Sequence, residues 1–107
     1  MKLTEYNKED LYRGTIIKFK HEYQSTYKKK DHTLMICEHA PQNDNEAPFA
    51  LYYIKGYYAG VLRFIFPKES LTKTPMTQAI SRRWVIENWN RYIFNSDIKK
   101  VKVEIEI

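Results

Sequence analysis

The sequence predicts an α+β domain in which a mostly antiparallel sheet of about five or more strands packs on one main C-terminal helix. Three observations support this prediction: several segments alternate apolar and polar residues, one later segment repeats apolar residues at spacings of three and four, and the last residues alternate again. A chain of 107 residues can bury one hydrophobic core, so residues 1–107 are expected to form a single domain.

Two strands are expected in the first forty residues. Residues 11–20 alternate apolar with polar side chains and end in charge, and residues 33–38 hold a shorter apolar run. The three lysines at 28–30 lie between these segments and are typical of a solvated turn. A polar stretch framed by two prolines, Pro41–Pro48, then predicts a long loop.

The two most β-prone segments, 49–54 and 57–66, are expected to form a hairpin. They are joined through Lys55 and Gly56, and glycine adopts the positive φ that a tight turn requires. Gly60 inside the second segment indicates a bulge or a close approach of another backbone. Because both faces of the second segment are largely apolar, we expect this hairpin to lie at the centre of the sheet.

Residues 81–93 predict the main helix. Ser81 can cap its first turn, and Ile80 and Val85 stand at the two positions of a hydrophobic staple. Thr74 followed by proline is also a helix-start signal, so an earlier start is the alternative. One apolar stripe runs along the helix, made of Val85, Ile86, Trp89, Tyr92 and Ile93.

The last residues predict a closing strand. Between positions 100 and 107, four apolar residues alternate strictly with charged ones: Val101, Val103, Ile105 and Ile107. Strands, a helix and a final strand in this order are typical of an antiparallel sheet packed on a helix.

The net charge and the cysteine content indicate the kind of partner and the cellular compartment of the protein. A net charge of +5 and a pI near 9.3 suit a polyanionic partner. No apolar run reaches the length of a signal peptide core or a membrane span. Cys37 is the only cysteine, which excludes an internal disulfide and favours a reducing compartment. We therefore expect a cytoplasmic protein with no membrane segment.

The residues that carry out chemistry are sparse and scattered. His21, His32 and His39 lie in or beside expected loops, where surface or strand-end roles are more common than acid–base catalysis. One cysteine and three separated histidines match no zinc spacing, and three glycines build no phosphate-binding loop. We expect no enzyme activity, no metal and no cofactor.

Nucleic-acid binding is the main alternative function, because a basic chain with aromatic strands is typical of sheets that stack bases. The tripeptide at 55–57 begins like a ribonucleoprotein strand motif. The next three residues, Tyr58, Ala59 and Gly60, depart from that motif.

Two segments resemble a known family. The first is a strand ending in Pro67-Lys68-Glu69, and the second is a helix with the pattern Ser81-x-x-Trp84-x-x-x-Asn88-Trp89. Over roughly residues 56–105 the chain is similar to small immunity proteins of bacterial polymorphic-toxin and contact-dependent growth-inhibition systems. This resemblance implies a non-catalytic protein whose partner is the C-terminal domain of a cognate toxin, and which protects the cytoplasm.

The basic net charge leaves two interpretations of toxin binding. Either the toxin presents an acidic surface to the lysine-rich part, or a local acidic loop enters a basic active site such as that of a nuclease. We favour the loop, because a long polar connection in a compact domain is often functional. Trp84 lies beside two arginines, where it either packs beneath the segment 67–75 or anchors a partner. The predicted toxin contacts are Glu38, Asp44, Glu46, Tyr57, Tyr58 and Trp84.

Overall fold

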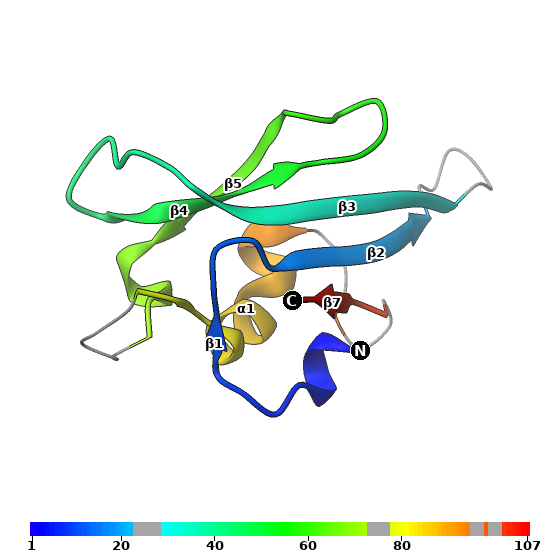
Figure 1. The fold of residues 1–107 in the computed structure, drawn as a ribbon, viewed down its shortest axis with the longest axis horizontal. Coiled ribbons are helices and arrows are strands. Elements are labelled where there is room, and N and C mark those ends of the chain that lie inside the picture. The colour runs from blue at the N-terminus through cyan, green and yellow to red at the C-terminus, as the bar shows by residue number, and fades with distance from the viewer. Residues whose placement is uncertain (23–28, 73–77, 95–97, 99–101) are drawn as a thin grey trace.

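The computed structural model describes residues 1–22, 29–72, 78–94, 98 and 102–107, and it has the predicted α+β fold (Figure 1). A five-stranded antiparallel sheet has the strand order β5-β4-β3-β2-β7. Its strands are β2 (Ile16–Glu22), β3 (Lys29–Glu38), β4 (Glu46–Tyr53), β5 (Leu62–Pro67) and β7 (Glu104–Glu106). A second, two-stranded sheet pairs β1 (Asp10–Leu11) with β6 (Ile80–Ser81).

One main helix follows β6 along the chain. It begins as α1 (Arg82–Asn88) and ends in a π-helical turn, η3 (Trp89–Ile93), where the Phe94 N–H donates to the Trp89 carbonyl over 2.8 Å. In Figure 1 this helix, β1 and η1 (Leu3–Glu5) lie on the same side of the larger sheet. A further 3-10 turn, η2 (Lys68–Ser70), follows β5. The alternative start at Thr74 and Pro75 falls outside the described residues.

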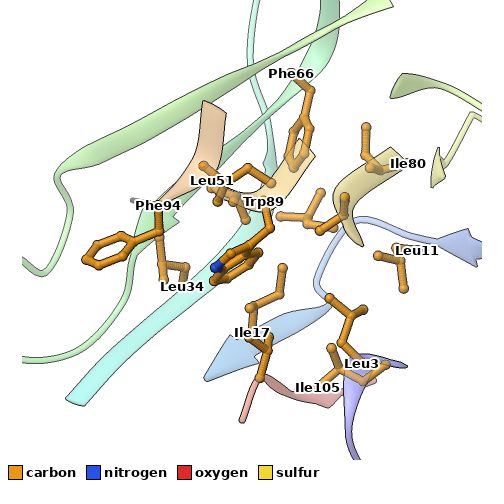
Figure 2. Packing of buried hydrophobic residues seen from close by; sticks show 14 of the residues in the cluster. Leu3, Leu11, Ile17, Leu34, Leu51, Phe66, Ile80, Trp89, Phe94 and Ile105 are labelled. Atoms are coloured by element: carbon orange, nitrogen blue, oxygen red, sulfur yellow. The ribbon is translucent and has the colours of Figure 1, made fainter. Parts of the chain in front are cut away.

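The core lies between this helix and one face of the larger sheet. Alternate residues of the paired strands face it, so that Ile17 of β2 and Leu34 of β3 stand opposite each other and are both buried. Trp89 is only 1% exposed and lies at the centre of the packed side chains (Figure 2). Its ring meets Phe19 edge to face, with centroids 5.0 Å apart. The helix is therefore held by a large aromatic side chain buried on the sheet.

The start of α1 is capped by Ser81 as the sequence predicts, and a carboxylate from a distant segment, Glu9, adds to the cap. The Ser81 hydroxyl accepts from the Trp84 N–H over 3.1 Å and donates to the Glu9 carboxylate. Glu9 also accepts from the Arg83 N–H over 2.9 Å. Partial burial by itself raises the pKa of the Glu9 carboxyl, but these hydrogen bonds and the nearby arginines Arg82 and Arg83 outweigh it and lower the pKa. Ionised Glu9 thus ties the N-terminal segment to the helix.

We expect Glu9→Gln to destabilise the fold at neutral pH by about 0.5–1 kcal/mol, the range of a helix cap weakened by solvent screening. Because the folded-state pKa is lowered, the stabilisation is present above the ordinary glutamate pKa of about 4.3. It is lost as the pH falls through the lowered value. Urea unfolding at pH 7 and at pH 3 measures both effects. Glu87→Gln, on the exposed side of the same helix, is the control, and equal losses for the two variants would contradict the prediction.

The predicted strand over 11–20 is wrong in its middle. β1 ends at Leu11, the chain turns at Gly14 with a φ of 91°, and β2 begins at Ile16. The Gly14 N–H donates to the Ile36 carbonyl over 2.8 Å, so this turn is fixed against β3. Lys29 and the residue after it belong to β3 and not to a turn.

The prediction that the hairpin of segments 49–54 and 57–66 lies at the sheet centre is also wrong. β5 is an edge strand, and residues 54–61 form a loop before it. The positive φ at Gly56 is confirmed, and Gly60 has one too, at 80° and 88° respectively. Two glycines in left-handed conformations widen the connection, so the strand starts only at Leu62.

The closing strand is joined by the first residues of the chain. The Leu3 N–H donates to the Val103 carbonyl, and the Ile105 N–H donates to the Met1 carbonyl, each over 2.8 Å. Val103 and Ile105 are buried as the alternation predicts, whereas Val101 lies outside the described residues. Residues 1–3 therefore pair with β7 on the side that β2 leaves open.

Candidate functional site

An acidic surface lies at the turn between β3 and β4. Glu38 ends β3 and pairs with the Arg13 guanidinium at 2.5 Å, and both side chains remain largely exposed. Asp44 is exposed in the connection. Glu46 is the first residue of β4 and not part of the loop, and its carboxylate accepts from the Gln42 N–H over 3.4 Å. We call Glu38, Asp44 and Glu46 the acidic end.

The fixed shape of this turn comes from local hydrogen bonds. The Asn43 side chain accepts from the Asn45 N–H over 2.9 Å, which is an Asx turn. The Asn45 carbonyl accepts from the Lys68 N–H of η2, also over 2.9 Å. A long polar connection is therefore held in one conformation, with its carboxylates presented to solvent.

Tyr57 and Tyr58 lie at the opposite end of β4, in the loop before β5. Tyr57 is 96% exposed, and Tyr58 is 47% exposed with its ring 5.6 Å from that of buried Tyr53. The eight residues of β4 separate this loop from the acidic end by roughly 25 Å. The structure thus does not gather the predicted acidic and tyrosine contacts into one cluster (Figure 1).

Trp84 packs largely within the domain. Its ring stacks on Tyr92 at 6.2 Å and on Phe64 of β5 at 6.1 Å. The remaining edge lines an open groove of about 500 Å³ together with Glu69 and Glu87. These contacts support the packing interpretation of Trp84, and only its edge is available to a partner.

Two of the three histidines are held by tyrosines. His32 is buried, with Nδ1 3.1 Å from the Tyr53 hydroxyl, and His39 Nδ1 lies 2.9 Å from the Tyr52 hydroxyl. The side chain of His21 lies outside the described part of the structure. Among the described residues no three His, Cys, Asp or Glu side chains are grouped to hold a metal ion. His32 in β3 and His39 just after it are therefore both held against β4 by tyrosine hydroxyls.

A basic hollow that the sequence did not predict lies beside the loop of Tyr57 and Tyr58, which we call the tyrosine loop. It measures about 700 Å³ and is flanked by Lys18, Lys20, Lys55 and Lys102, with Asp31 and Glu104 among them. A hydrogen bond from Lys18 and its positive charge lower the pKa of the Glu106 carboxyl. The alternation of Lys18 and Lys20 along one strand was a signal for this hollow, whereas the approach of Lys55 and Lys102 depends on the fold. The molecule therefore has an acidic end and a basic end.

Exposed tyrosines, a fixed acidic turn and a basic hollow on a small rigid sheet are features of a domain that binds another macromolecule. The chain belongs to the Immunity protein 45 family, whose sequence model matches residues 3–103. Immunity proteins of this kind belong to bacterial polymorphic toxin systems and neutralise a cognate toxin without enzyme activity of their own. A match to the chain is found neither among the curated proteins nor among the solved structures.

The family confirms the predicted resemblance and the expected absence of enzyme activity. In the part of the chain that is described, no helix is long and apolar enough to cross a membrane.

Proposed function

We propose that this protein neutralises its toxin by covering the toxin's active site or substrate groove. The observation that carries this proposal is the acidic end: three carboxylates lie in or beside a turn that local hydrogen bonds hold, in a chain whose net charge is +5. A nuclease offers a basic groove that binds phosphates, and such a groove accepts carboxylates in their place. The toxin class that fits best is therefore a nuclease, met in the cytoplasm.

The predicted contact residues are proposed to touch different parts of the toxin. Glu38, Asp44 and Glu46 meet the basic groove, while Tyr57 and Tyr58 contact the toxin beyond it. Trp84 contributes only the edge that its packing leaves free.

Co-expression tests the proposal. The protein is produced with the C-terminal domain of the large secreted protein encoded immediately upstream, and growth and co-purification are measured. We expect a stable one-to-one complex and restored growth. Growth arrest without a complex would contradict the proposal.

The basic hollow favours one second function, binding of nucleic acid through Lys18, Lys20, Lys55 and Lys102. Phosphate contacts release counterions, so such binding weakens steeply with salt. Salt-dependent binding of a mixed-sequence RNA oligonucleotide by the protein alone, together with failure of the co-expression test, would favour this function.

A further inference from the structure

The larger sheet has a second face, opposite the core. The strand registers place Ile16 opposite Met35 and Met35 opposite Tyr52, and Tyr52 stands opposite Leu62 at the start of β5. The neighbouring row pairs Cys37 with Ala50, and Ala50 with Ile65. We call these two rows the outer sheet face; its residues are Ile16, Met35, Cys37, Ala50, Tyr52, Leu62 and Ile65.

This face is unusually apolar for its position. An antiparallel sheet with one solvated face normally alternates apolar residues inward with polar residues outward. In these two rows the outward positions of β2 to β5 carry aliphatic side chains, a tyrosine and a thiol, and Glu106 of β7 continues the first row beside Ile16. α1, η1 and β1 lie on the other side of the sheet (Figure 1). Of the seven residues of this face, Leu62 is 40% exposed, Ala50 is fully buried and the other five are partly exposed.

The outer sheet face runs between the two ends of the sheet. At one end Tyr52 is joined through His39 to the turn between β3 and β4, and Glu46 stands opposite Pro67. At the other end Leu62 adjoins exposed Val61. Glu46 and Val61 therefore mark the two margins of this surface.

Two of the other predicted contacts belong to the opposite face of the sheet. Glu38 stands opposite buried Phe49, and the Tyr58 ring packs on buried Tyr53.

The dimensions of this surface suit a protein partner. Four strands about 4.8 Å apart, extended by a loop at each end, give an area on the order of 800 Å². That is the area each partner contributes to a standard interface. An apolar centre with charged and aromatic margins is also the usual arrangement of such an interface.

We infer that the outer sheet face seats the toxin, whose matching surface has an apolar centre and a basic margin that meets Glu46 and, in the turn beside it, Asp44. This inference rests on the proposed function and specifies the surface used. Charge complementarity fixes the orientation, because a basic margin is attracted to the acidic end and repelled by the lysines of the basic hollow.

The single cysteine reports directly on this surface without any mutation. Cys37 is partly exposed on the outer sheet face, and burial raises the pKa of its thiol. Alkylation by iodoacetamide at pH 8.5 is therefore slow but measurable in the free protein. In the complex with a catalytically inactive form of the upstream toxin domain, we expect the rate to fall roughly tenfold or more.

A pair of matched substitutions tests the same surface by affinity. Leu62→Asp places a charge on the outer sheet face, and Tyr92→Asp places one on the helix at a similar exposure of 48%. We expect Leu62→Asp to weaken toxin binding by about 100-fold and Tyr92→Asp to leave it nearly unchanged. Urea unfolding of both variants verifies that they fold.

Two results would overturn the inference. A complex that restores growth while Cys37 is alkylated at the free rate would place the toxin elsewhere and leave the proposed function intact. Protection of Cys37 that increases with the concentration of the protein alone would assign the face to a second copy of the chain.

Discussion

Trp89→Ala is expected to lower the free energy of unfolding by about 3–5 kcal/mol, the usual range for removing a fully buried tryptophan. Trp89 is 1% exposed and fixes η3 against β2 through the ring of Phe19. Because small domains are stable by only about 5–15 kcal/mol, this loss removes a large part of the stability, and near the lower limit it leaves a large unfolded population. Protection against the toxin should weaken in proportion to the folded protein that is lost.

Chemical denaturation followed by circular dichroism measures this effect. The chain offers a control of the same residue type, since Trp84→Ala removes a partly buried ring that also touches Phe64. We expect a smaller loss there, about 1–2 kcal/mol. Equal losses of unfolding free energy for the two variants would mean that Trp89 is no more important to the core than Trp84.

Reversal of the acidic end, by Glu38→Lys, Asp44→Lys and Glu46→Lys together, is expected to weaken toxin binding by about 100-fold, or roughly 2.7 kcal/mol. The attraction between these carboxylates and a basic groove becomes repulsion. Most of the effect should be visible in the association rate at low salt and should shrink at high salt, because the charges are exposed.

A second triple variant controls for net charge. Asp31→Lys, Glu104→Lys and Glu106→Lys change the charge by the same amount at the basic end of the molecule. Glu106 adjoins Ile16 at the far margin of the outer sheet face, so we expect some loss of binding to the inactive toxin domain, but a much smaller one than for the acidic end. Equal weakening in both variants would show that overall charge, and not the acidic end, governs binding.

The elements that the sequence predicts well are those that a local pattern defines. The cap at Ser81 and the burial of Trp89 follow from residues within two helical turns, and the structure confirms both. The edge position of β5 and the pairing of Leu11 with Ile80 depend on contacts between distant segments, which periodicity does not contain.

The candidate contacts show the same division. Tyr57 is highly exposed because it lies in the loop between Gly56 and Gly60. Its β propensity had predicted a strand residue, and that prediction is wrong. The distance between this tyrosine and Asp44 follows from the length and direction of β4. Residue type therefore indicates which side chains are available, and strand topology decides which of them share a surface.

The pairing of β7 with both β2 and residues 1–3 makes closure of the sheet depend on segments that are far apart along the chain. Glu104–Glu106 lies between the two, so one short strand holds Met1 and Ile16 in place at the same time. Contacts of high sequence separation form slowly, because the intervening chain must first be closed into a loop. We therefore expect β7 to join the sheet late in folding, and one edge of β2 to stay unpaired until it does.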